Sequence, residues 1–462
     1  MNKISEIIDG GYCIGCGACA AVAPESIRIG FNRNGQYEAS LHNDSLTTEI
    51  EKRVSYVCPF SDDGPNEDDI AKLSYSGASG TKRDSRIGSY KSLYVGHVAE
   101  SDFRDIGTSG GVITWTLAEL LSTGKVDAVI HVVPSGQAGK DVLFEFGVSK
   151  SVEDVKVGTK SRYYPVEMSS VLQTVMNTPG NYVVVGLPCF IKAVRRLALQ
   201  DEVFASRVKF TVGLVCGHLK SRAFADYFAW NEGIQPGKLE AIDFRVKQSS
   251  GPAGYYGVKV EGGGIQEERL AKKYFGYNWG YNFFRYSACD YCDDVFSETA
   301  DLCVGDAWLP GYNADSKGNS VVVVRSSELH ELFAGAVQDG RLRFSCADAD
   351  LIAKSQSGGL RDRREGLSYR LYLKERAGES APHKRVAPNA DGISRKRKAI
   401  YRVRMRLREC SHKYWLEAVE ANSLQLFKRK MRFLMMCNDL LYFKPIALVR
   451  RCVRAAVRRI QR

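Results

Sequence analysis

Short apolar runs alternate with helical patterns through the middle of the chain. The runs have the length and the β-branched content of buried strands, and amphipathic or apolar helical stretches separate them. We expect strands over residues 92–98, 126–133, 181–185 and 208–215, and helices over residues 112–121, 190–199 and 221–230. This alternation predicts an α/β (mixed α+β) fold built on an open parallel sheet.

The remaining residues divide around this centre. With 462 residues and 44% apolar content, the chain has room for a core and for two or three domains. We expect a small ferredoxin-like lobe over residues 1–60, a surface linker over 61–90, a central domain over 91–360 and a basic helical tail over 361–462. The linker is predicted from its clustered Asp and Gly residues.

The charge of the chain supports a boundary near residue 360. The net charge is +12, but residues 361–462 hold 28 Lys and Arg against 9 Asp and Glu, a net of +19. The first 360 residues hold 37 basic and 44 acidic side chains, a net of −7. The body is mildly acidic and the tail strongly basic, and this difference predicts a domain boundary near Ser357-Gly358-Gly359.

Three closely spaced cysteines give the strongest chemical signal. Cys13, Cys16 and Cys19 follow the CxxCxxC spacing that binds three corners of an iron–sulfur cluster. The position of the usual fourth cysteine is Ala23, before Pro24, so we predict that Cys58, before Pro59, supplies the fourth thiolate of a [4Fe-4S] cluster. A zinc ribbon is the alternative, although it usually has two CxxC pairs.

A second set of thiols is predicted at the edge of the sheet. Cys189 and Cys216 each follow a strand and precede a helix, so they belong to the edge where parallel sheets bind ligands. The CxxC pair Cys289 and Cys292 completes four sulfurs. Cys303 is a rival for one of these positions. We interpret the remaining cysteines as small hydrophobic residues: Cys346, Cys410, Cys437 and Cys452.

A glycine-rich turn stands between the first expected strand and its helix. In Gly107-Thr108-Ser109-Gly110-Gly111 the glycines would let backbone N–H groups approach a phosphate at the start of the helix. A tight turn needs glycines for steric reasons as well, so this turn alone is a weak signal.

Taken together and in order, these segments resemble the family of coenzyme F420 hydrogenase/dehydrogenase β-subunits. The resemblance covers about residues 13–325. It rests on both cysteine sets, on the turn at 107–111, and on further short segments: Ser161-Arg162-Tyr163, Gly186 to Cys189, Val215 to His218, Asp301 to Asp306 and Lys317 to Ser320. The chain departs from the family at Arg162, where a lysine is usual, and at Cys303.

The resemblance implies an iron–sulfur flavoprotein oxidoreductase. It implies FAD held by residues of the turn and of two nearby segments: Thr108, Ser109, Gly110, Gly111, Ser161 and Pro188. A cluster carries one electron and a hydride equivalent needs two, so the flavin would convert between them. Candidates for proton supply or substrate contact are Arg162, Tyr163, His218 and Asp306. His218 has an alternative role, tuning the cluster sulfurs, and Asp306 has one as a turn cap.

The implied partners are a ferredoxin-type electron donor and a small organic substrate, in surface-polysaccharide or cofactor metabolism. Two other functions stay open: an electron-transfer subunit that serves a partner enzyme, and a non-enzymatic, cluster-stabilised scaffold that binds membrane or nucleic acid through its basic tail, with the sulfurs purely structural. The resemblance does not fix the substrate, because relatives act on a deazaflavin or on chlorophyll-type rings.

The end of the chain has the pattern of a basic amphipathic helix. Apolar residues recur at helical spacing over 446–460 with arginines between them. Such a helix lies on an anionic membrane, docks on a partner or is a solvated appendage. Nucleic acid is not expected, since no recognition motif accompanies the charge.

The location is predicted from what the sequence contains. The first residues have no apolar segment of a secretory signal, and no run reaches the roughly 18 apolar residues of a spanning helix. Thirteen cysteines, an odd number, favour reduced thiols and metal ligation over a disulfide framework. We therefore expect a cytoplasmic protein, peripheral at the inner face of the membrane if the tail binds lipid.

Overall fold

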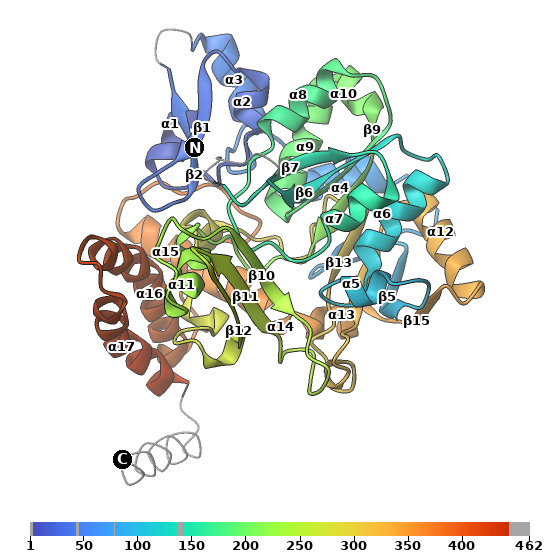
Figure 1. Cartoon of the computed structure of the whole chain (residues 1–462). Helices are drawn as coiled ribbons and strands as arrows, with labels where there is room; N and C mark the ends of the chain where they lie inside the picture. The colour runs from blue at the N-terminus through green and yellow to red at the C-terminus, as the bar shows by residue number, and fades with distance from the viewer. Residues whose placement is uncertain (1–2, 43–45, 78, 136–141, 443–462) are drawn as a thin grey trace.

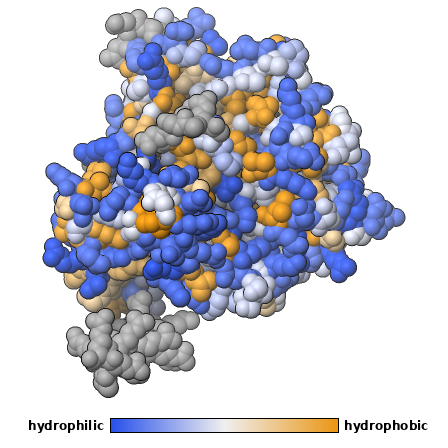
Figure 2. Space-filling model, viewed as in Figure 1, coloured by the Kyte–Doolittle hydropathy of each residue, from blue (hydrophilic) through white to orange (hydrophobic). Residues whose placement is uncertain are grey.

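A computed structural model describes residues 3–42, 46–77, 79–135 and 142–442. The face in Figure 2 is largely hydrophilic, with apolar side chains in small separate groups. Within the described residues, no helix has the length and apolar character needed to cross a bilayer.

An eight-stranded mixed sheet forms the centre of the molecule (Figure 1). Its strand order is β15 (Leu342–Cys346), β5 (Ser92–Val98), β14 (Ser320–Val324), β13 (Leu302–Asp306), β9 (Val208–Leu214), β8 (Tyr182–Gly186), β6 (Ala128–Pro134) and β7 (Phe144–Ser149). The four strands β13, β9, β8 and β6 run parallel, and antiparallel strands extend both sides. The expected α/β fold is confirmed, but the sheet is mixed rather than purely parallel, because β14 and β7 return as hairpin-like neighbours of β13 and β6.

Helices cover this sheet. They are α5 (Phe103–Ile106), α6 (Val112–Ser122), α7 (Val152–Val157), α8 (Ser169–Asn177), α9 (Pro188–Gln200), α10 (Glu202–Arg207) and α12 (Ser327–Gln338). Helix α6 is apolar on most sides, and its buried Trp115 and Leu120 pack in one cluster with strands β6, β8 and β9. The predicted helices therefore form where their apolar residues are needed to bury the sheet.

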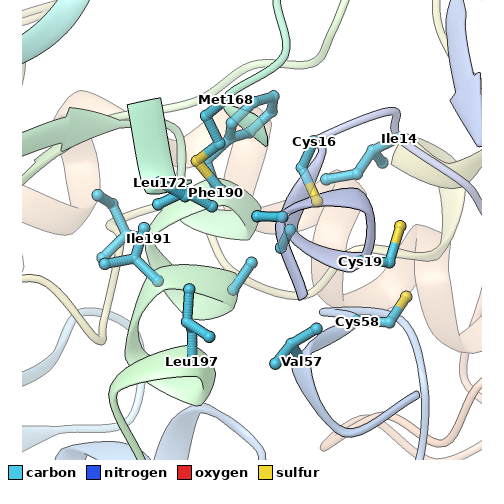
Figure 3. Packing of buried hydrophobic residues seen from close by; sticks show 14 of the residues in the cluster. Ile14, Cys16, Cys19, Val57, Cys58, Met168, Leu172, Phe190, Ile191 and Leu197 are labelled. Atoms are coloured by element: carbon cyan, nitrogen blue, oxygen red, sulfur yellow. The ribbon is translucent and has the colours of Figure 1, made fainter. Parts of the chain in front are cut away.

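A small lobe precedes the sheet in the chain. It contains α1 (Ile4–Asp9), α2 (Ala18–Val22), the hairpin of β1 (Ile27–Phe31) and β2 (Tyr37–Leu41), and α3 (Thr48–Val57). Its buried residues share one apolar cluster with α8 and α9 (Figure 3). The lobe is thus packed directly on the central domain.

Residues 61–90 differ from the expected linker. They contain α4 (Glu67–Tyr75) and the hairpin of β3 (Lys82–Asp84) and β4 (Gly88–Tyr90). Asn66 caps α4 through a reciprocal capping box with Asp69, and Ile70 and Tyr75 are buried. The acidic cluster that suggested a linker is the capped first turn of a packed helix.

A second, smaller sheet lies beside the central one. It consists of β10 (Ala241–Val246), β11 (Gly257–Gly262) and β12 (Ile265–Leu270), with α11 (Ala223–Asn231) packed on it. Short helical turns η1 (Ala271–Lys273), η2 (Trp279–Tyr281), η3 (Ala288–Tyr291) and η4 (Tyr312–Ala314) follow. These turns connect the small sheet to β13 and β14.

The basic segment from residue 361 is largely helical and packed on the body. It follows α13 (Ala349–Ser355) and contains α15 (Leu367–Arg376), α16 (Arg395–Glu420) and α17 (Leu424–Leu441). Trp415 and Phe427 of α16 and α17 enter the aromatic cluster beneath the small sheet. The charge pattern predicts a boundary near residue 360, but α14 (Ser357–Arg361), the π-helical η5 (Asp362–Gly366) and α15 follow one another directly across it. The predicted amphipathic helix over 446–460 lies outside the described residues.

Candidate functional site

The first four thiols lie at the contact between the lobe and α9. Cys13 and Cys16 belong to the turn before α2, Cys19 lies in α2, and Cys58 follows α3. Figure 3 shows Cys16, Cys19 and Cys58 directing their sulfurs to a common side of the lobe. Gly15 has a φ of +62°, and an added Cβ there would lie 2.3 Å from the Tyr37 carbonyl oxygen, so a side chain would open the turn.

The surroundings of these thiols favour a bound metal centre. Burial raises the pKa of Cys13 to about 12, and the backbone N–H groups of Gly15 and Ala39 donate to its sulfur at 3.4 Å. Burial raises the pKa of Cys19 well above its usual value, and the three neighbouring thiols raise it further. Four mutually interacting, buried thiols are costly to ionise alone, and a soft metal centre offsets that cost. The donor set fits an iron–sulfur cluster.

The second four thiols come from three distant segments. Cys189 lies in the first turn of α9, Cys216 follows β9, Cys289 lies in η3, and Cys292 ends that turn. Because β8 and β9 are parallel neighbours, their two cysteines reach the same edge of the sheet. Burial raises the pKa of Cys189 well above its usual value, and Cys292, Cys216 and Cys289 add to the effect. The four thiols predicted from sequence are thus neighbours.

Cys303 lies in different surroundings. It is fully buried in β13 among apolar side chains of a separate cluster that includes Phe296 and Val323, whereas Cys189, Cys289 and Cys292 belong to the cluster shared with the lobe. Cys410 is buried, and Cys346 is exposed, unlike the buried residue expected from sequence. Among the described residues, no group of three or more His, Cys, Asp or Glu side chains is arranged to hold a single metal ion.

Helix α9 connects the two thiol sets. It carries Cys189 in its first turn, and two turns later Arg196 donates to carbonyl oxygens around Cys58. Cys16 also raises the pKa of Cys189, although burial is the main cause. Buried Tyr286, whose hydroxyl accepts from the Tyr37 N–H at 2.8 Å, is within electrostatic reach of both Cys13 and Cys289. The two sets are therefore close neighbours across the lobe contact.

The glycine-rich turn leads into α6 as predicted. Gly111 is its N-cap with a φ of +79°, and no side chain caps the helix, so the first N–H groups lack the usual side-chain acceptor. Ser109 donates to the Asn319 carbonyl at 2.8 Å, and Thr108 and Ser161 share a hydrogen bond of 3.1 Å. An uncapped helix start beside hydroxyl groups suits an anionic group such as a flavin pyrophosphate.

Two cations that no sequence pattern singles out support this turn. Lys247 donates to the Ser109 carbonyl at 3.0 Å and to the Arg104 carbonyl. Burial, then the neighbouring Arg104, lowers the pKa of Lys247 to about 8. Arg104 donates to the Gly318 carbonyl and pairs with Asp315. Each cation acts through a residue more than 100 positions away in the chain, so only the fold identifies them.

A row of aromatic side chains joins the turn to the second thiol set. Tyr163 contacts Trp279 with ring centroids 4.8 Å apart, and Trp279 contacts His218 at 4.6 Å. Tyr163 is held beside Ser161, next to the turn, and His218 lies two residues after Cys216. Trp279 was not predicted, although the aromatic run from Tyr274 to Tyr286 was a signal for it.

The other predicted site residues surround this row. Asp306 pairs with buried Arg245 at 2.7 Å, which places it beside Tyr163 rather than in a turn cap. Arg162 donates to the Thr159 carbonyl at 3.1 Å and lies over the Phe144 ring. Pro188 is buried at the start of α9.

Several buried polar atoms around the row have no partner. Among the described residues, Arg162 Nε, Arg245 Nε and His218 Nε2 make no hydrogen bond. Burial lowers the pKa of His218 well below its usual value, so its ring is neutral. Unsatisfied buried donors of this kind are expected where a polar ligand binds. The residues present fit a flavin between the turn and the second thiol set.

A surface cavity of about 500 Å³ lies elsewhere. It is lined by charged residues around β12, among them Glu232, Glu268 and Arg269. None of the thiols or turn residues lines it, and its polar wall lacks the apolar surface typical of cofactor sites. We do not assign the redox chemistry to this cavity.

Comparison with protein families gives two matches. The model of the coenzyme F420 hydrogenase/dehydrogenase β-subunit N-terminus matches residues 93–173, and that of its C-terminus matches residues 180–350. The matches contain the turn, Tyr163 and the second thiol set. They do not contain the first thiol set, α4 or the helices after residue 350.

Two curated relatives are named for coenzyme F420. The chain is 26% identical over 345 residues to the coenzyme F420-dependent sulfite reductase of Methanocaldococcus jannaschii, covering 71% of this chain and 47% of that protein. It is 23% identical over 322 residues to a subunit of the F420H2 dehydrogenase of Methanosarcina mazei, covering 68% of this chain and 80% of that protein. The chain thus spans about half the length of the sulfite reductase.

The chain is similar in fold to solved structures. A chain of the F420-reducing [NiFe] hydrogenase complex from Methanosarcina barkeri aligns with a TM-score of 0.50 and 20% identity, over 66% of this chain and all of that one. The similarity supports the mixed α/β architecture.

Proposed function

The chain belongs to the family of coenzyme F420 hydrogenase/dehydrogenase β-subunits, and from this membership we propose that it is an iron–sulfur flavoprotein oxidoreductase. In this proposal Cys13, Cys16, Cys19 and Cys58 hold one [4Fe-4S] cluster, and Cys189, Cys216, Cys289 and Cys292 hold another. FAD binds at the turn of Thr108 to Gly111. When bound, these groups supply one-electron transfer and its conversion to two-electron chemistry.

The proposal is carried by one observation, the continuous arrangement from the lobe to the turn. Helix α9 spans the two thiol sets, and the row of Tyr163, Trp279 and His218 continues from the second set to the turn. Electron transfer requires centres that are near one another in a matrix that excludes water. This arrangement supplies both conditions.

The side chains around the row have separate tasks. Arg245 holds Asp306 and reaches Tyr163, so it fixes two polar groups beside the proposed flavin. Neutral His218 packs on Trp279 and can offer a hydrogen-bonding nitrogen without adding charge. Arg162 supplies a guanidinium at the border of the site, where burial lowers its pKa.

We propose the substrate and the electron donor by chemical class only. The relatives' names point to coenzyme F420, a deazaflavin, as an electron donor or acceptor, and a ferredoxin-type protein is the donor expected from the cluster content. The second reactant is a small organic molecule, with a role in surface-polysaccharide or cofactor metabolism.

Cofactor analysis of anaerobically purified protein tests the proposal. We expect roughly eight irons and one flavin per chain. Gly110→Ala places a Cβ 2.8 Å from Ser320 Oγ and 2.9 Å from the Gly96 carbonyl oxygen, so it should distort the turn and lose flavin while keeping iron. Gly335→Ala, where a Cβ meets nothing within 4 Å, is the matched control and should keep both. Zinc in place of iron, or flavin bound by Gly110→Ala as by the wild type, contradicts the proposal.

A second candidate function is an electron-transfer subunit whose chemistry is completed on a partner enzyme. It is favoured by relatives that are named as a dehydrogenase subunit and as part of a hydrogenase complex. The isolated chain distinguishes the two functions. A flavin reduced by dithionite and reoxidised by F420 or another small acceptor indicates the enzyme, whereas reoxidation only after a partner protein is added indicates the subunit. A scaffold in which the sulfurs are structural would hold metal at the thiols but no flavin.

A further inference from the structure

The second thiol set is held by arginines from the segment that follows the family match. Arg363, in the π-helical η5, donates to the carbonyl oxygens of Cys216 and Gly217 at 2.9 and 2.8 Å. Arg370 of α15 donates to the Asp290 carbonyl at 2.7 Å, and Arg408 of α16 pairs with the Asp290 carboxylate at 3.1 Å. Both loops that carry the thiols are therefore fixed by residues beyond position 350.

Arg363 is the cation that interacts most strongly with the thiols of Cys216 and Cys292, whereas Arg285 interacts most strongly with that of Cys289. Arg363 is 2% exposed. The buried guanidinium lies within electrostatic reach of three of the four thiols, those of Cys292, Cys216 and Cys289.

The charge of Arg363 is directed to the thiols. Its hydrogen bonds go to backbone carbonyls, and the neighbouring carboxylate of Asp362 is occupied by Arg285, Arg370 and Arg404 at 3.1, 3.2 and 3.4 Å. Among the described residues, the other charged groups near the set are Asp293, Asp294, Lys384, Arg285 and Lys220. Asp293 pairs with Arg385 at 3.2 Å.

The π-helical η5 carries Arg363 at the second thiol set. Successive residues Arg363 and Arg364 leave η5 in different directions: Arg363 toward Cys216 and Arg364 toward the Ser85 carbonyl and Glu298. π-helical turns are rare in proteins overall, but those that occur are often found at functional sites. Such a turn displaces a side chain from its regular helical direction.

We propose that Arg363 is a positioning residue of the second thiol set and that its guanidinium raises the reduction potential of the centre bound there. This inference rests on the proposed function. A centre held by four thiolates is anionic, and reduction makes it more negative, so a fixed buried cation favours the reduced state. The basic segment, which the sequence sets apart as a tail, thereby belongs to the redox site.

The test is a dithionite titration of the anaerobic holoprotein, followed by electron paramagnetic resonance. One electron enters the centre and no proton is required. Arg363→Gln removes the positive charge and keeps an N–H group that can donate to the backbone carbonyls. We expect the reduction equilibrium of the second centre to shift at least tenfold toward oxidation, about 59 mV for a one-electron couple. Arg363→Lys keeps the charge and should recover at least half of the shift, and Arg364→Gln is the matched control and should not move it.

The outcomes separate this inference from the proposed function. A wild type without two iron–sulfur signals overturns both. Two other results overturn only the role of Arg363, provided that the wild type shows both signals. One is a potential in Arg363→Gln that equals that of the wild type, and the other is a shift in Arg363→Lys as large as that in Arg363→Gln. If Arg363→Gln releases the iron of the second set, Arg363→Lys is compared with the wild type instead. Equal reduction potentials in Arg363→Lys and the wild type then support the role of the charge, and a tenfold shift of the reduction equilibrium between them overturns it.

Discussion

The two thiol sets are built in opposite ways. In the first set Cys13 and Cys16 lie on one turn, Cys19 lies in the helix α2 that follows it, and Cys58 follows the neighbouring helix α3. In the second set Cys189, Cys216 and the pair at 289 and 292 come from segments about 30 and 70 residues apart, which the sheet brings to one edge. A local set requires only a turn, whereas an assembled set requires a correctly formed sheet and something to hold its loops.

The arginines show what this difference demands of the molecule. In the first set Arg196 donates to carbonyls of the Cys58 loop. The second set is held by Arg363, Arg370 and Arg408 from the C-terminal segment. Long-range assembly buries carbonyls of these loops and the carboxylate of Asp290, which pairs locally with Arg285 at 3.2 Å, and the basic segment supplies further partners. These three arginines of the basic segment are therefore structural.

Of the changes that test the comparison between the two thiol sets, Cys189→Ser should have the largest effect. It removes one ligand from the assembled set and leaves the local set intact, so iron content should fall by half while the first cluster signal stays. Iron analysis and electron paramagnetic resonance measure both. Cys303→Ala, a buried thiol of the neighbouring strand, is the control and should keep all the iron. The ligand set is wrong if Cys303→Ala loses iron and Cys189→Ser does not.

A smaller effect is expected from Arg196→Met in the local set. Arg196 is 1% exposed and donates to the carbonyls of Ser61, Gly64 and Pro65 at 3.1, 2.7 and 3.0 Å, as well as to that of Cys58. Loss of a buried donor to several carbonyls should lower the free energy of unfolding by about 3 kcal/mol.

Urea unfolding under anaerobic conditions measures this change. Lys52→Met, an exposed cation on α3, is the control and should leave the midpoint unchanged. Equal midpoints for the two variants would show that the Cys58 loop is held without Arg196.

The smallest effect is a pH dependence of the assembled region. Burial lowers the pKa of His412 to about 4, and its Nε2 lies 3.1 Å from the Arg285 carbonyl oxygen, which ties α16 to the loop of Cys289. The unfolded chain binds this proton near pH 6.5 and the folded chain does not, so stability is lost as pH falls below 6.5. The loss between pH 7 and pH 5 should be about 2 kcal/mol.

His412→Gln removes the titrating group. The free energy of unfolding in urea should then lose about 2 kcal/mol less between pH 7 and pH 5 than it does in the wild type. His42→Gln, an exposed residue of the lobe, is the control. An unchanged slope in His412→Gln would contradict a neutral, buried His412.

The sequence alone determined the elements and the local chemistry. The strands and helices of the centre were predicted because their apolar patterns are strong, and β5, β8 and β9 begin within one residue of the expected positions. The first set was predicted because its spacing is local. The second set was predicted only because parallel strands deliver their ends to one edge, a rule of topology that sequence order can invoke.

The tertiary structure decided what depends on distant partners. The basic segment is bound to the body because opposite charges from remote segments meet there: Arg385 with Glu298 and Arg408 with Asp290. The acidic stretch at 66–69 caps α4 locally, but its Glu67 pairs with the distant Lys192 at 3.0 Å. Trp279, Lys247 and Arg363 gain their positions from the fold as well. Sequence patterns report which side chains are apolar or charged, and only packing determines which charge meets which partner.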